Sequence, residues 1–102
     1  MTNKQIPLEF TVDELVAFCQ QHQIKRLALF GSVLRTDFGP ESDLDVLVEF
    51  DPSARIGLLA YAKTQRELSD FFQRPVDLVT PEGLKPLIKP QILKEAKVLY
   101  AA

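Results

Sequence analysis

Residues 31–50, GSVLRTDFGPESDLDVLVEF, hold the two features around which the rest of the chain is arranged. The pair Gly31-Ser32 follows directly after a short apolar run, and Asp43 and Asp45 stand one residue apart at the start of a second apolar run. Glycine lets a backbone approach a ligand closely, and the free amides of the turn after it can bind phosphate oxygens. The stretch therefore predicts a phosphate-binding turn beside a strand with acidic side chains.

Length and composition limit the classes of protein to consider. The chain has 102 residues, 46% of them hydrophobic and 25% charged, which predicts one globular domain over residues 1–102 with a flexible lead-in at 1–7. A net charge of -2 disfavours a long nucleic acid as partner. Cys19 and His22 are the single residues of their types, which excludes a disulfide scaffold and a zinc domain. Apolar runs are too short to span a membrane and no signal sequence is visible, so we expect a cytoplasmic protein.

Hydrophobic periodicity predicts an α/β (α+β) fold with a small sheet flanked by helices. Thr11 and Glu14 have capping-box spacing before the first helix, in which Val12 and Cys19 are expected on the apolar face. His22 is expected in a solvated or dipole-favoured position near the C-terminal end of that helix. We expect strands at 26–30, 43–50, 76–79 and, as an edge strand, 97–100, with helical segments at 12–22, 32–35, 58–72 and 92–96.

The spacing of Asp43 and Asp45 points to metal binding. Residues i and i+2 of a strand project from one face, with Cα atoms about 6.5 to 7 Å apart. Two carboxylates about 4 Å apart repel by roughly 4 kcal/mol at an effective dielectric near 20, and a hard cation such as Mg²⁺ relieves that repulsion. An isolated Asp-x-Asp is more often a solvated strand start, so the Gly31-Ser32 turn is needed to favour a site.

Asp77 adds a third carboxylate in the apolar segment 76–79. We expect this segment to be an interior strand of the same sheet. An unpaired charge there would be expensive to bury, and a metal ion would relieve the cost. The three aspartates are therefore predicted to form one catalytic and metal-binding group.

These residues match the signature of a known superfamily. Gly31-Ser32, Arg35, Asp37 and the run SDLDVLV at 42–48 closely resemble the DNA polymerase β-like nucleotidyltransferases. The segments RPVDLV at 74–79 and ILKEAKVLY at 92–100 resemble the minimal branch of that superfamily, the MntA-type antitoxins. The resemblance covers about residues 25–100. Thr36 departs from the pattern, because this branch often has glycine there.

The resemblance implies a role for each matching residue. Asp43 and Asp45 would coordinate two Mg²⁺ ions, and Asp77 would share one of them and orient or deprotonate the acceptor hydroxyl. The nucleotide-binding residues would be Gly31, Ser32, Arg35 and Ser42, with Gly31 and Ser32 at the β- and γ-phosphates of ATP. An exposed helix charge is an equally good interpretation of Arg35.

The resemblance also implies a partner. In the minimal branch, AMP is moved from ATP to a tyrosine of a HEPN-fold RNase toxin of the HepT type. The leading hypothesis is therefore a protein adenylyltransferase that acts as an antitoxin in a hetero-oligomer with its toxin. Two alternatives stay open: the same chemistry on a small-molecule acceptor such as an aminoglycoside, and a non-catalytic antitoxin that neutralises by binding.

Overall fold

The computed structural model describes residues 8–34 and 42–102, with only the backbone of Ser32. The predictions made for residues 1–7 and 35–41, including Arg35 and Thr36, lie outside these ranges. The elements are α1 (Val12–Gln21), β1 (Ile24–Phe30), the 3-10 helix η1 (Gly31–Leu34), β2 (Leu44–Phe50), α2 (Leu58–Phe72), β3 (Val76–Val79), the 3-10 helix η2 (Pro81–Gly83), α3 (Lys89–Glu95) and β4 (Lys97–Ala101).

The described strands form one mixed sheet in the order β3-β2-β1-β4. β1 is antiparallel to both β2 and β4, whereas β2 and β3 are parallel. A parallel pair needs a long crossover, and α2 supplies it between β2 and β3. The predicted small sheet flanked by helices is confirmed, with β4 at one edge.

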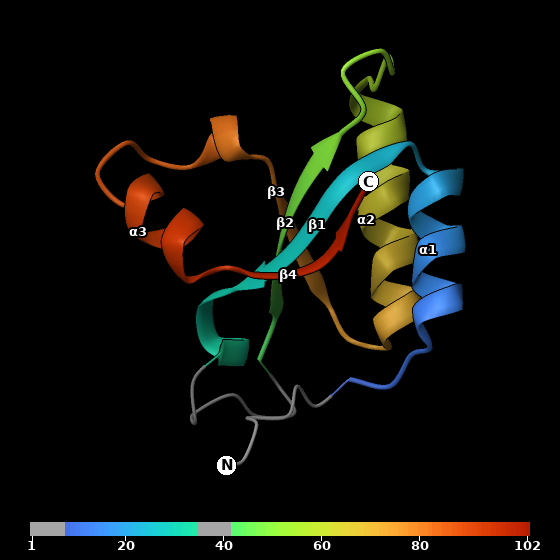
Figure 1. Ribbon diagram of the computed structural model, residues 1–102, viewed down its shortest axis with the longest axis horizontal. Coiled ribbons are helices and arrows are strands. Elements are labelled where there is room, and N and C mark those ends of the chain that lie inside the picture. Colours follow the sequence, from blue (N-terminus) through green and yellow to red (C-terminus); the bar gives the residue numbers. More distant parts are fainter. Residues whose placement is uncertain (1–7, 35–41) are drawn as a thin grey trace.

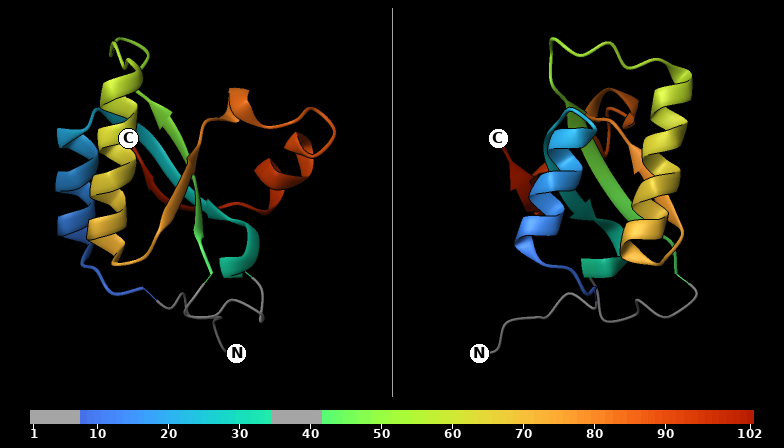
Figure 2. Two further views of the ribbon diagram at one scale, coloured as in Figure 1. Left: turned by 180° about the vertical axis from the view of Figure 1, so that it is seen from behind. Right: turned by 90° about the vertical axis from the view of Figure 1, so that its right-hand side faces the viewer.

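The two faces of the sheet have different neighbours. α1 and α2 lie together on one face, and α3 lies on the other side of the sheet (Figures 1 and 2). Strand residues alternate between the faces, so every second side chain enters the core beneath α1 and α2. The side chains of this core with no measurable exposure are Cys19, Leu27, Leu29, Leu44, Val46, Val48 and Leu68.

The first helix begins as its sequence predicts. The Thr11 hydroxyl accepts a hydrogen bond from the Glu14 amide at 3.1 Å, and the Glu14 carboxylate accepts one from the Thr11 amide at 3.2 Å. This capping box satisfies two amides that lack helical partners. Cys19 is fully buried as expected, but Val12, predicted on the apolar face, is 71% exposed.

Side chains of α2 close the outer edge of β3. Ser69 accepts a hydrogen bond from the Val76 amide, Gln65 accepts one from the Leu78 amide, and the Tyr61 hydroxyl donates to the Leu78 carbonyl. Residues 61, 65 and 69 are spaced by four and therefore lie on one side of the helix. We call these three side chains the edge ladder, and they fix β3 against α2.

Three details of the expected helices and strands differ in the structure. His22 was expected in a solvated or dipole-favoured position; it is the C-cap residue of α1, but its side chain is only 10% exposed and its Nε2 lies 2.9 Å from a carboxylate oxygen of Glu67. Leu58, expected on the apolar face of α2, is 83% exposed, while Thr64 is buried. β1 begins at Ile24, two residues before the predicted start, because Ile24 already packs in the core.

Candidate active site

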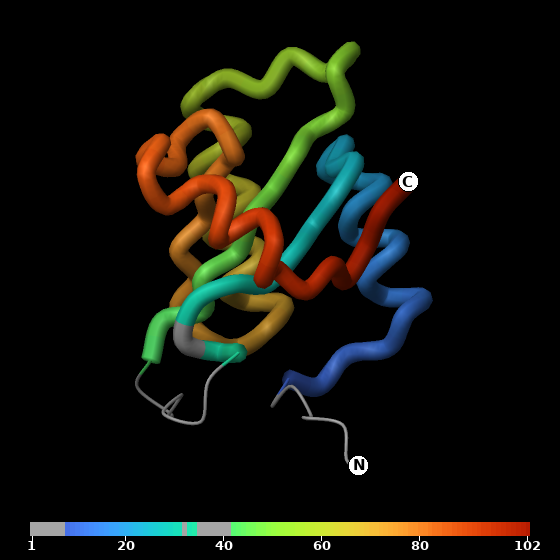
Figure 3. Tube along the Cα trace, turned by 60° about the vertical axis from the view of Figure 1, so that its left-hand side comes forward, coloured from blue at the N-terminus to red at the C-terminus, as the bar shows by residue number. Residues whose placement is uncertain are grey.

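Gly31 begins the turn after β1 and packs beside Asp45 of β2. Figure 3 shows the end of β1 lying next to the start of β2. Its φ of +78° lies in the left-handed region, which residues with a side chain rarely adopt. A Cβ atom on Gly31 would lie 3.1 Å from the carboxyl carbon of Asp45 and closer still to one of its oxygens. Glycine is thus required for two reasons: the left-handed backbone conformation, and the Asp45 carboxylate that occupies the space of a Cβ atom.

Three strands bring the central acidic residues into one row. Phe30 of β1 pairs with Asp45 of β2, and Asp45 pairs in turn with Asp77 of β3. Neighbouring strands lie about 4.7 to 4.9 Å apart, so the two aspartate backbones are adjacent. Because Val46 and Leu78 are buried beneath α1 and α2, alternation places Asp45 and Asp77 together on the opposite, open face.

The argument from burial that led to Asp77 is wrong. β3 is an edge strand, not an interior one, and the Asp77 side chain is exposed. No burial cost has to be relieved there. Asp77 belongs beside Asp45 because of the parallel register of β2 and β3. Its charge also reaches α2: burial, and secondarily Asp77, raise the pKa of Tyr61 above its ordinary value.

Asp43 stands one residue before β2, and it is exposed. The segment around it is fastened to the start of β3 from two sides. The Leu44 amide donates to the Pro75 carbonyl at 2.8 Å, and the Arg74 guanidinium donates to the Ser42 carbonyl at 3.4 Å. Sequence analysis placed Arg74 in the family-like segment 74–79 but gave it no contact, so its hydrogen bond to the residue before Asp43 was missed.

The predicted metal ligands are chemically suited to Mg²⁺, because all three are carboxylates on or next to the open face. Within residues 8–34 and 42–102, no three His, Cys, Asp or Glu side chains are already arranged to hold a metal ion. Metal binding by Asp43, Asp45 and Asp77 therefore stays a prediction. The side chain of Ser32 and the whole of Arg35 lie outside the described part of the chain.

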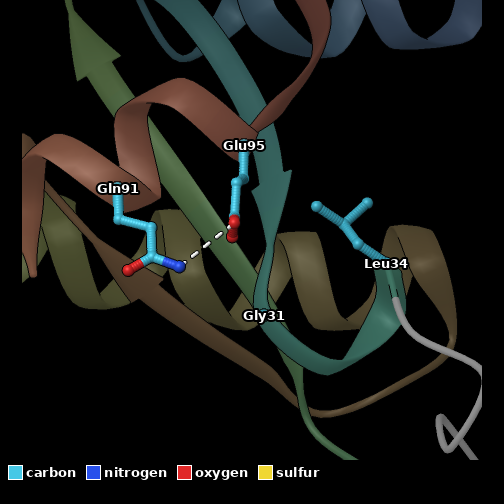
Figure 4. A pocket seen from close by; sticks show the side chains of 4 residues that line it. All are labelled: Gly31, Leu34, Gln91 and Glu95. Atoms are coloured by element: carbon cyan, nitrogen blue, oxygen red, sulfur yellow. Dashed lines mark hydrogen bonds between the residues drawn. The ribbon is translucent and has the colours of Figure 1, made fainter.

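A wall of the site that sequence reasoning missed comes from α3. Gln91 and Glu95 line a pocket of about 580 Å³ together with Gly31 and Leu34 (Figure 4). The helical segment was expected only at 92–96, whereas α3 begins at Lys89 with Pro90 in its first turn, where proline is tolerated. The helical spacing of residues 88, 91, 92 and 95 is the signal that could have found the wall.

In the described residues, no helix is both long and apolar enough to cross a membrane.

Comparison with known proteins gives the family. The nucleotidyltransferase domain family matches residues 12–99. A candidate protein adenylyltransferase of Methanocaldococcus jannaschii, MJ0435, is 34% identical over 83 residues, which cover 81% of this chain and 87% of that protein. The protein adenylyltransferase MntA of Thermococcus cleftensis is 28% identical over 95 residues, 83% of this chain and 92% of the relative.

Solved structures agree with this family. A candidate minimal nucleotidyltransferase, 34% identical, superposes with a TM-score of 0.68 over 83% of this chain and 85% of its own. A toxin-antitoxin structure with AMP-PNP has a TM-score of 0.69 at 18% identity, covering 91% of this chain and 75% of that one. A tri-AMPylated HEPN toxin in complex with MNT antitoxin from Shewanella oneidensis gives 0.61 at 18% identity, with 89% and 70% covered. At 18% identity the likeness is one of fold.

The fold and the sequence relatives lead to the same assignment. The mixed four-stranded sheet with helices on both sides is the polymerase β-like nucleotidyltransferase fold that the residues at 31–48 predicted. The family match covers nearly all of the chain. The chain therefore belongs to the nucleotidyltransferase domain family, as an enzyme of its minimal, MntA-like type.

Proposed function

We propose that this enzyme moves AMP from ATP to a tyrosine hydroxyl of a HEPN-fold RNase toxin of the HepT type and thereby acts as its antitoxin. The observation that carries the proposal is the pairing of Asp45 with Asp77, next to the left-handed turn at Gly31. It provides adjacent carboxylates beside a turn suited to phosphate. The sequence relatives named as protein adenylyltransferases support AMP as the group transferred.

Asp43, Asp45 and Asp77 are the residues that would hold Mg²⁺, as two ions. When bound, Mg²⁺ neutralises charge on the triphosphate and on the pyrophosphate that leaves. Gly31 and the backbone amides after it would hold the β- and γ-phosphates, since the free amides at the start of the helical turn η1 can donate hydrogen bonds to phosphate oxygens. Ser32, Arg35 and Ser42 are proposed to contact the same nucleotide.

Asp77 is proposed to accept the proton of the tyrosine hydroxyl. The tyrosine oxygen then forms a bond to the α-phosphorus while the bond from that phosphorus to the pyrophosphate oxygen breaks. The edge position of β3 suits this role, because it leaves Asp77 exposed to an acceptor carried by another protein. We also propose a cytoplasmic location, because the reaction consumes ATP.

A toxin partner is favoured over a small acceptor by the fold neighbours. One of these neighbours is a complex of a tri-AMPylated HEPN toxin with an MNT antitoxin. A small acceptor such as an aminoglycoside would leave the toxin in that complex unexplained, and neutralisation by binding alone would leave its AMP groups unexplained. We therefore propose a hetero-oligomer with the toxin.

The test combines the protein, Mg²⁺, labelled ATP and a HEPN-type toxin as partner. We expect the partner to gain one or more AMP groups by intact-mass measurement and to lose RNase activity. Asp43→Asn and Asp45→Asn should abolish the mass gain. Asp70→Asn is the matched control, because Asp70 is exposed on α2, which lies on the far side of the sheet.

Each alternative has its own outcome. Full neutralisation by Asp43→Asn with no mass gain would show that binding alone is the mechanism. Transfer of AMP to a soluble hydroxylated compound with an unmodified partner would show a small-molecule acceptor.

A further inference from the structure

The open face of the sheet is walled by one face of α3. Ile88, Gln91, Ile92 and Glu95 line a pocket of about 310 Å³ whose other side holds Phe30, Gly31 and Asp45. Their spacing of i, i+3, i+4 and i+7 places the four residues on one side of the helical segment. We call these four side chains the α3 wall.

The polar part of the α3 wall is aimed at the turn after β1. Gln91 and Glu95 line both this pocket and the one that includes Leu34, and Gly31 is common to the two. Figure 4 shows both side chains leaving α3 on the side of Gly31. The Gln91 amide donates a hydrogen bond to the Glu95 carboxylate at 3.2 Å, which restricts where that carboxylate can point.

The negative charge of Glu95 restricts which part of a ligand can contact it. The turn at Gly31 is suited to phosphate oxygens, which carry the same charge as Glu95 and are repelled by it. The group that contacts Glu95 must therefore donate hydrogen bonds or be a cation. The other side chains of the α3 wall, Ile88 and Ile92, are apolar and offer packing surface but no hydrogen bonds.

The neighbouring atoms of a nucleotide decide which donor this is. If Asp45 lies at the α-phosphate, the next group along the nucleotide is the ribose, whose two hydroxyls are donors. Carboxylates accept such hydroxyls in dinucleotide-binding proteins. Glu95 shares the pocket with Asp45, and the flat apolar surface of Ile88 and Ile92 suits a sugar or base ring.

We propose that Glu95 binds the ribose of the nucleotide by accepting hydrogen bonds from its 2′- and 3′-hydroxyls, with Gln91 as the positioning residue that orients the carboxylate. This role rests on the proposed function only in taking a nucleoside triphosphate as substrate. It makes the α3 wall the part of the site that distinguishes ribonucleotides from deoxynucleotides.

The test measures binding and needs no partner protein. The dissociation constants of ATP, 2′-deoxy-ATP and 3′-deoxy-ATP are measured by calorimetry with Mg²⁺ for the intact protein and its variants. We expect the intact protein to bind ATP about 10- to 100-fold more tightly than the weaker deoxy analogue, the size of a hydrogen bond to a charged group. In Glu95→Ala this ratio should fall to about 1 to 2, with ATP weakened and the deoxy analogue unchanged.

Further variants separate charge, position and folding. Glu95→Gln keeps an acceptor oxygen without the charge and should retain a preference of about 2- to 10-fold. Gln91→Ala should reduce the preference less than Glu95→Ala does. Glu9→Gln is the matched control, because Glu9 is exposed ahead of α1, and its preference should equal that of the intact protein. Thermal melting of each variant checks that it is folded.

Three outcomes would overturn the proposal. One is equal binding of ATP and both deoxy analogues by the intact protein. Another is an unchanged preference in a folded Glu95→Ala variant. The third is a Glu95→Ala variant that keeps the preference but needs more Mg²⁺ for half-saturation, which would make Glu95 a metal ligand. Failure of AMP transfer to the toxin would contradict the proposed function and leave these ratios unaffected.

Discussion

The two faces of the sheet differ in what their side chains can do. On the face beneath α1 and α2, strand residues such as Leu44 and Val46 are fully buried and make only apolar contacts. On the other face, alternate residues of the same strands include Asp45 and the exposed Asp77, and α3 covers only part of it. In β2 and β3 the pleat thus separates core residues from the aspartates of the site, and the two sets can be changed separately.

The largest expected effect is a loss of stability from the helix-covered face. Leu68 of α2 has no exposed surface, so Leu68→Ala leaves a cavity and should lower the free energy of unfolding by about 2 to 5 kcal/mol. Denaturant unfolding followed by circular dichroism measures this. Leu59→Ala is the control on the same helix: Leu59 is 87% exposed, and the change should stay within about 0.5 kcal/mol. Equal losses in the two variants would contradict the assigned core.

On the open face, Gly31→Ala should damage chemistry more than stability. The new Cβ would displace the Asp45 carboxylate, and a misplacement of about 1 Å can cost about 100-fold in rate. The rate of AMP transfer at saturating ATP is the measurement. Gly83→Ala is the control, since a Cβ there meets its nearest atom, the Thr80 hydroxyl oxygen, at an ordinary 3.5 Å. Full activity of Gly31→Ala would show that the turn is not part of the active site.

The edge ladder joins the two faces, because it holds β3 and therefore Asp77. Gln65→Ala removes the acceptor of the Leu78 amide and should lower the free energy of unfolding by about 1 to 2 kcal/mol. Gln20→Ala, an exposed change on α1, should cost less than about 0.5 kcal/mol. Hydrogen exchange of the Leu78 amide gives a local measurement, and we expect faster exchange in Gln65→Ala but not in Gln20→Ala. Unchanged exchange in Gln65→Ala would contradict a stabilising role for the edge ladder.

The smallest effect near neutral pH concerns the buried thiol of the helix-covered face, because its raised pKa changes stability only in alkaline solution. Burial raises the pKa of Cys19 from 9.0 to about 12, so above pH 9 the unfolded chain loses this proton while the folded chain keeps it. Stability from this group is therefore complete below pH 9 and is lost as pH rises toward 12. Between pH 9 and 12 the denaturant midpoint of Cys19→Ala should therefore fall less steeply with pH than that of the intact protein. Below pH 9 the two midpoints should change with pH in parallel. Identical alkaline slopes would contradict the raised pKa.

Sequence patterns predicted much of this arrangement because alternation and capping are local properties. The alternation in β2 was enough to place Asp45 opposite the core, and Thr11 with Glu14 was enough to start α1. The position of Asp77 was predicted for the wrong reason, since burial was assumed where only strand register decides. Register between β2 and β3 depends on the packing of α2, which no local pattern contains.

The contact of the α3 wall with the site could not be predicted for a related reason. The spacing of residues 88, 91, 92 and 95 indicates a common helical face, but whether Glu95 on that face points to solvent or to the site depends on how the chain returns from β3. Arg74 was missed similarly, because its contact with the Ser42 carbonyl joins residues 32 positions apart. Residues that act through long-range contacts are those that a single sequence hides.

The edge ladder has a consequence for how this sheet can grow. An exposed strand edge is a template for a further strand, from another chain or from an inserted segment. At β3 that template is already occupied by Tyr61, Gln65 and Ser69 of α2. Lateral extension of the sheet, whether by misassembly, by a bound peptide or by an engineered strand, is thereby restricted to β4, on the side of the sheet away from Asp77.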